Sequence, residues 1–144
     1  KRDAPTRYLL VNADRFPRRP LPRVSLGTRE AFRRQFISRD RIVVDPGLGF
    51  AKDLAQNWEL VARLDELKKL GLPILVGASR KRFIAGVLEP DENGEVSNNR
   101  RDVATAVLTA LLLQRKLWAV RVHNVLTTAD AIDVVEALRN GDNS

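Results

Sequence analysis

From residue 42 onward, the chain repeats one pattern three times: a short apolar run suited to a buried β-strand, then a longer segment with helical spacing. The three apolar runs are Ile42–Val44, Pro73–Gly77 and Trp118–Val122. Strands that alternate with helices form parallel sheets, because a helical crossover returns the chain to begin the next strand in the same direction. The pattern therefore predicts an α/β fold with three consecutive βα units.

The spacing of apolar residues also predicts where the helices lie. Asn57 is expected to cap the first helix, which carries Leu60, Val61, Leu64 and Leu67 on one face and stops at Gly71. The second helix is expected from Asp102 to about Lys116. The third is expected to be capped by Thr127 or Thr128 and to end near Gly141.

The second predicted helix is apolar around almost its whole circumference. Valine, alanine and leucine fill nine of the eleven positions from Val103 to Leu113. A helix on one face of a sheet buries only one stripe, so the remaining apolar surface needs a second cover. The interior of a larger domain and a subunit interface both satisfy this requirement.

The excess positive charge lies in the N-terminal part of the chain. Residues 1–41 hold 12 of the 25 Lys and Arg but only 4 of the 18 Asp and Glu. Three prolines favour extended backbone from Phe16 to Arg23, although Tyr8–Val11 could form a short strand and Arg29–Ile37 a short helix. We expect residues 1–28 to be an irregular basic arm and residues 29–144 to form the α/β region. The arm has no recognisable nucleic-acid module, so nucleic acid is not the expected partner.

The composition excludes several kinds of site. Without cysteine there is no disulfide, thiol nucleophile or cysteine-bound metal, and a single histidine leaves no histidine-rich metal site. The longest apolar run, Ala104–Leu113, is too short to cross a bilayer, and residues 1–24 lack the apolar region of a signal peptide. We therefore expect a cytoplasmic protein with no membrane partner.

Polar clusters follow each predicted strand, at the strand ends where parallel α/β folds bind ligands. Asp45 is followed by the turn-forming Gly47 and Gly49, and Ser79 is followed by Arg80, Lys81 and Arg82. Arg121 and His123 share one strand face because side chains alternate. Each cluster taken singly has an equally good structural explanation. The first could be an acidic strand end, the second a solvated charge run, and the third a structural histidine. Together they predict one site with a carboxylate and several cations.

The three motifs, in this order, resemble the C-terminal part of the dihydropteroate synthase family. They read DPGLGF from Asp45, GASRK from Gly77 and RVH from Arg121, and the resemblance covers roughly residues 41–138. One departure is Asn124, where the family usually has Asp. The resemblance implies strands six to eight of a (β/α)8 barrel, with residues 29–38 from the fifth helix. A whole barrel takes about 250 residues, so we expect a partial barrel and an incomplete chain.

The resemblance also implies a transferase of folate biosynthesis, which condenses 6-hydroxymethyl-7,8-dihydropterin pyrophosphate with p-aminobenzoate. Asp45 and Lys81 would be catalytic and, with Arg121, would bind the pterin. Phe50, Ser79 and Lys81 would bind p-aminobenzoate, and Arg121 and His123 would hold the pyrophosphate. Mg²⁺ would arrive on that pyrophosphate, with no metal ligand from this chain.

The implied assembly is a homodimer or larger oligomer, and the chain alone is expected to be weakly active or inactive. The alternative is a non-catalytic half-barrel that serves as a dimerisation or complementing partner.

Overall fold

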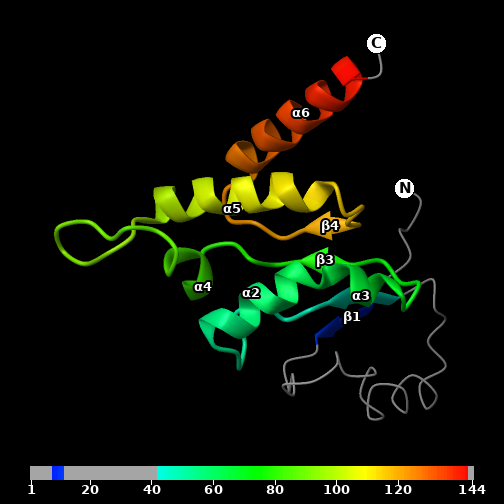
Figure 1. Cartoon of the computed structure of the whole chain (residues 1–144), viewed down its shortest axis with the longest axis horizontal. Helices are drawn as coiled ribbons and strands as arrows, with labels where there is room; N and C mark the ends of the chain where they lie inside the picture. The colour runs from blue at the N-terminus through cyan, green and yellow to red at the C-terminus, as the bar shows by residue number, and fades with distance from the viewer. Residues whose placement is uncertain (1–7, 12–41, 143–144) are drawn as a thin grey trace, which may run out of the picture.

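The computed structural model describes residues 8–11 and 42–142 (Figure 1). Within this part, four short strands run parallel: β1 (Tyr8–Val11), β2 (Ile42–Asp45), β3 (Leu75–Val76) and β4 (Ala119–Val120). Strand β1 pairs with β2, and β3 pairs with β4. A parallel bridge between Val44 and Ile74 joins the two pairs. The predicted α/β class with parallel strands is confirmed.

Strand β1 forms at the segment of the expected irregular arm where the sequence allows a short strand. Tyr8 lies opposite Ile42, and Val11 lies opposite Asp45. Four consecutive residues of good β-propensity meet a buried strand whose edge offers unpaired backbone groups, and pairing satisfies both. The segments predicted as extended (Phe16–Arg23) and helical (Arg29–Ile37) lie outside the described residues, as does the arm boundary at residue 28.

A helical segment follows each of the last three strands. After β2 come α2 (Leu54–Ala62) and α3 (Leu64–Lys68). After β3 come α4 (Arg82–Ala85) and α5 (Asn98–Leu113), and after β4 comes α6 (Val125–Asp142). Helix α5 lies along the sheet, whereas α6 crosses α5 and points away from the body (Figure 1). No helix in the described ranges has the length and apolar character that a membrane span requires.

The first two helices begin earlier than the apolar spacing predicts. Asp53, and not Asn57, caps α2: its side chain accepts the Gln56 N–H at 2.7 Å while Gln56 reaches back to the Asp53 N–H. Helix α5 begins at Asn98 with Ser97 as its cap, so the predicted start at Asp102 is wrong. Apolar spacing marks where a helix meets the core, whereas the cap marks where it begins.

The remaining boundaries differ for similar reasons. Asn124 Oδ1 accepts the Thr127 N–H at 3.1 Å, so α6 starts at Val125 and neither predicted threonine is the cap. The first predicted helix breaks between α2 and α3 and ends at Lys68, and Gly71 adopts a φ of 64° in the turn that follows. Strands β3 and β4 are shorter than the apolar runs that predicted them.

The core lies between the sheet and helices α2 to α5. It holds the predicted face Leu60, Val61 and Leu64, and Trp58 packs edge-to-face on Phe83 with ring centroids 5.1 Å apart. Helix α5 contributes Leu108 and Leu112. Three further apolar residues of α5, Val103, Val107 and Leu111, are each more than half exposed. The second apolar stripe that the sequence predicts therefore exists, and the described residues leave it uncovered.

Candidate functional site

The three predicted polar clusters meet at one edge of the sheet. Because the strands are parallel, their carboxyl ends bring together the segments that follow β2, β3 and β4. Side-chain contacts link these segments in pairs: Asp45 with Arg121, Ser79 with His123, and Phe50 with Lys81. Residues up to 76 positions apart in the chain thus form one rim.

Asp45 is the buried centre of this rim. Its carboxyl group is 1 % exposed, accepts the Gly47 N–H at 2.8 Å and pairs with Arg121 Nη2 at 3.2 Å. A buried carboxylate needs such partners because burial removes the hydration that stabilises its charge. The Arg121 side chain is half exposed, so Arg121 faces solvent while its partner Asp45 is buried.

Gly77 makes room for Arg121. A Cβ atom at Gly77 would lie 2.7 Å from Arg121 Nη2 and 3.1 Å from Nε, closer than non-bonded atoms approach. The guanidinium therefore crosses directly over the backbone that leaves β3. This close approach, and no unusual φ, is what favours a glycine here.

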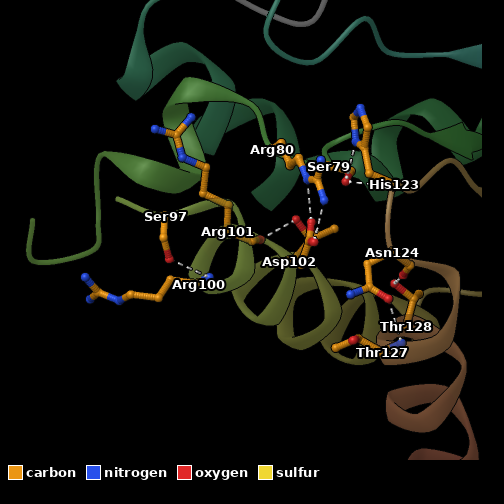
Figure 2. A network of polar contacts seen from close by, with 11 residues as sticks. Ser79, Arg80, Ser97, Arg100, Arg101, Asp102, His123, Asn124, Thr127 and Thr128 are labelled. Carbon is orange, nitrogen blue, oxygen red and sulfur yellow. Dashed lines mark hydrogen bonds and ion pairs between the residues drawn. The ribbon is translucent and has the colours of Figure 1, made fainter. Parts of the chain in front are cut away.

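Ser79 holds His123. The Ser79 Oγ lies 2.9 Å from His123 Nδ1 and accepts the His123 backbone N–H at 3.1 Å (Figure 2). If the hydroxyl donates its hydrogen bond to Nδ1, the neutral imidazole carries its proton on Nε2, directed away from the serine. Ser79 is buried and His123 is exposed. The serine therefore orients an imidazole ring that a ligand can reach.

Phe50 and Lys81 form the third contact of the rim. Lys81 Nζ lies 3.9 Å from the centre of the Phe50 ring, which is the geometry of a cation–π contact. The Lys81 chain runs over Gly49, where a Cβ atom would lie 2.6 Å from Lys81 Cδ. Gly49 also has a φ of 76°, so both its conformation and its close contact favour glycine.

The loop that carries Phe50 has a strained backbone. Gly47, Gly49 and Ala51 have φ values of 65°, 76° and 47°. For alanine the left-handed conformation costs about 1–2 kcal/mol, so the surroundings must hold it. Lys52 Nζ donates to the carbonyl oxygens of Gly47 and Phe50 at 2.8 and 3.0 Å, and Asn57 accepts the Gly49 N–H at 2.7 Å.

The three consecutive cations of the second motif point in different directions. Arg80, with a φ of 58°, turns toward α5 and makes two hydrogen bonds of 2.8 and 2.7 Å to the buried Asp102 (Figure 2). Lys81 turns toward Phe50, and Arg82 begins α4 as an exposed residue. The motif therefore contributes one cation, Lys81, to the rim, and Arg80 serves as a clamp to α5.

The Arg80 guanidinium holds the pKa of the Asp102 carboxyl below its usual value, and a hydrogen bond from Asn124 adds to the effect. The same pair raises the pKa of Arg80. Asn124 also caps α6, so its amide supplies an acceptor to the helix and a donor to Asp102. An aspartate here could cap the helix equally well, but it would place a second negative charge beside Asp102.

Sequence reasoning identified the rim residues. It named Asn57 and Asp102 only as helix starts and missed that both are buried polar residues behind the rim. Both carried a signal. Asn57 shares a helical face with Leu60, Val61 and Leu64, and Asp102 precedes the buried Thr105 and Ala106 by three and four positions. A polar residue on a core-facing stripe must find partners inside the protein.

The described residues do not form a site for a resident metal ion. No group of three or more Asp, Glu, His or Cys gathers within ranges 8–11 and 42–142. At the Arg121 end of the rim the groups are a guanidinium and an imidazole, whereas Mg²⁺ prefers carboxylate, carbonyl and water oxygens. This end of the rim suits an anion.

Comparison with known proteins agrees with this geometry. Residues 23–123 match the family model described as pterin binding enzyme. Dihydropteroate synthase of Mycobacterium leprae is 47 % identical over 96 residues, which are 67 % of this chain and 34 % of the relative. The chain thus spans about a third of the length of that curated relative.

Solved structures give the same result. The crystal structure of Yersinia pestis dihydropteroate synthase matches with a TM-score of 0.68 at 33 % identity, over 79 % of this chain and 51 % of that one. Dihydropteroate synthase from Xanthomonas albilineans, solved in complex with 7,8-dihydropteroate, matches with a TM-score of 0.67 at 30 % identity, over 91 % of this chain and 50 % of the other. These neighbours assign the α/β architecture to the TIM-barrel fold, and the chain belongs to the family of pterin-binding enzymes that includes dihydropteroate synthase.

Proposed function

We propose that this chain carries the C-terminal part of a dihydropteroate synthase site, which acts in folate biosynthesis in the cytoplasm. In the reaction, the amine nitrogen of p-aminobenzoate bonds to the methylene carbon of 6-hydroxymethyl-7,8-dihydropterin pyrophosphate, and the carbon–oxygen bond to pyrophosphate breaks. The observation that carries the proposal is the set of contacts at the rim: a buried carboxylate paired with an arginine, a cation–aromatic pair, and a histidine bonded to a serine.

Asp45 is proposed as the pterin anchor. Its two oxygens already accept the Gly47 N–H and an Arg121 N–H, so the group is oriented and charged before a ligand arrives. A pterin presents adjacent ring and amino N–H donors that suit a carboxylate. As pyrophosphate leaves, positive charge develops at the methylene group, and a fixed nearby anion stabilises it.

Lys81 and Phe50 are proposed to bind the aromatic amine. A flat aromatic ring fits against the Phe50 ring and the aliphatic part of Lys81, and the Lys81 ammonium reaches the pterin side. Ser79, which the resemblance assigns to p-aminobenzoate, is bonded to His123, so in this proposal it contributes by fixing that ring.

Arg121 and His123 are proposed to hold the departing pyrophosphate. Arginine suits phosphate oxygens because it offers several N–H groups in one plane, and the His123 ring is accessible. Any Mg²⁺ would enter with the pyrophosphate, because the described residues at this end offer cationic and imidazole groups and no carboxylate cluster.

We also propose that the chain associates, either as a homodimer or with a segment that supplies the rest of a barrel. An apolar groove of about 560 Å³ runs beside the stripe of Val103, Val107 and Leu111. Trp58 lines this groove, and its indole nitrogen is buried without a hydrogen-bond partner among the described residues. A partner surface that is mainly apolar fits the groove. The alternative function, a non-catalytic half-barrel, rests on this same surface.

Calorimetric titration with 6-hydroxymethyl-7,8-dihydropterin pyrophosphate tests the proposed function. Asp45→Asn removes the charge but keeps the shape, and it should weaken binding by about 2–4 kcal/mol, since hydrogen bonds to a buried charge are worth more than neutral ones. Asp133→Asn, on an exposed position of α6, is the matched control and should bind as the unchanged chain does. Equal affinities for the Asp45 variant and the control would refute the assignment.

A further inference from the structure

Asn57 is a buried residue that connects helix α2 to the Phe50 loop. Only 2 % of its surface is exposed. Its side-chain oxygen accepts the Gly49 N–H at 2.7 Å, and its nitrogen donates to the carbonyl oxygens of Asp53 and Lys52 at 2.7 and 3.3 Å. The amide therefore uses both its donor and its acceptor group, and no apolar or singly functional side chain replaces it.

The contacts of Asn57 lead directly to the rim. It holds Gly49, whose backbone supports the Lys81 chain so closely that a methyl group would not fit between them. Lys81 in turn places its ammonium 3.9 Å from the centre of the Phe50 ring. Phe50 follows Gly49 directly, so the position of Gly49 affects both the Phe50 ring and the Lys81 chain.

The backbone conformation of the loop makes such a support necessary. Gly47 and Gly49 adopt the left-handed conformation readily, but Ala51 does not, so the loop needs contacts that hold it. Lys52 holds the solvent side of this turn by donating to Gly47 and Phe50. Asn57 holds the core side, and it does so from a helix and not from another loop.

From this arrangement we propose that Asn57 is a positioning residue, which sets how the Lys81 chain lies against the Phe50 ring and so the affinity for an aromatic amine. The inference rests on the proposed function, because it assumes that Phe50 and Lys81 together form part of the p-aminobenzoate subsite. Asn57 touches no substrate in this proposal. It acts through Gly49.

The test compares Asn57→Ala with Leu60→Ala, which removes a buried side chain from the same helix that cannot hydrogen-bond to the loop. In NMR spectra of the folded chain, the Phe50 ring should shift the Lys81 ε-methylene protons upfield, and Phe50→Leu defines the unshifted position. Asn57→Ala should remove more than half of this shift, whereas Leu60→Ala should retain it. Asn57→Asp keeps the acceptor for Gly49 and should give an intermediate value, which also covers the case in which the alanine variant does not fold.

Ligand binding provides the second measurement. Asn57→Ala should weaken p-aminobenzoate binding at least tenfold and change the affinity for the pterin pyrophosphate less than twofold. A full ring-current shift in folded Asn57→Ala and Asn57→Asp would overturn the positioning role. If the unchanged chain binds neither ligand while the shift still depends on Asn57, the proposed function fails and the structural role of Asn57 stands.

Discussion

The close approach of Arg121 to Gly77 gives a sharp test, because Gly77→Ala adds a single methyl group beneath the Arg121 guanidinium. That methyl carbon would lie 2.7 Å from Arg121 Nη2, so the guanidinium must move. The atom in the way is the far end of a flexible side chain, and Gly77 has no left-handed φ, so the backbone itself accepts alanine. The substitution therefore removes the Arg121–Asp45 pair and leaves the fold intact.

Two opposing effects set the magnitude. Asp45 is 1 % exposed and loses one of its two hydrogen-bond partners, which costs about 1–3 kcal/mol. Replacing glycine by alanine at a compatible position stabilises by about 0.4–1 kcal/mol, because it restricts the unfolded chain. The free energy of unfolding should therefore fall by roughly 0.5–2 kcal/mol, as the difference of the two effects.

Urea denaturation of a double-mutant cycle measures the contact directly. In the background Arg121→Ala the new methyl group meets no guanidinium, so Gly77→Ala should be neutral or stabilising there, by up to about 1 kcal/mol. The coupling between the two sites should be about 1–3 kcal/mol. If Gly77→Ala costs the same with and without Arg121, the steric account of this glycine is incorrect.

Two further predictions concern α5. Arg80 lowers the pKa of Asp102, so this pair stabilises the fold fully above the ordinary aspartate pKa near 3.8 and progressively less as the pH falls through the lowered value. Asp102→Asn should lower the free energy of unfolding at pH 7 by about 3 kcal/mol and flatten its dependence on pH below 4, as measured by denaturation between pH 2 and 7. Leu111→Glu should shift sedimentation at micromolar concentration from dimer to monomer, whereas Gln114→Glu, the same charge change at the end of the helix, should not; a monomeric unchanged chain would contradict the proposed homodimer.

The rim was predictable from the sequence because it follows from two strong regularities. Short apolar runs alternate with helical spacing, and parallel strands place whatever follows them at one edge. Asp45, Ser79 and Arg121 therefore had to lie near one another once the runs were recognised as strands. Their separate roles were carried by family resemblance, because spacing alone does not distinguish a substrate contact from a structural one.

The directions of individual side chains were not predictable in the same way. Arg80 and Lys81 are neighbours with equal charge, yet one faces α5 and the other faces Phe50. The difference comes from the left-handed backbone at Arg80, which forms because a buried carboxylate from a helix more than twenty positions along the chain is available. A tertiary contact decides such a conformation, and local propensity opposes it.

Strand β1 is a further case in which tertiary context decided the outcome. The proline and charge content around Tyr8–Val11 favoured an irregular arm, and four residues are too few to give a convincing strand signal. The neighbouring strand β2 is buried along its whole length, so its backbone groups need partners whatever supplies them.

Helix α5 carries both Asp102, which binds Arg80, and the uncovered apolar stripe. Asp102 and Val103 are consecutive residues, one directed toward the site and the other exposed. If covering the stripe shifts α5, it changes the affinity of the rim for its ligand. Thermodynamic reciprocity then requires the ligand to change the strength of association by the same factor. Ligand titrations at several protein concentrations would measure this coupling as a concentration-dependent dissociation constant.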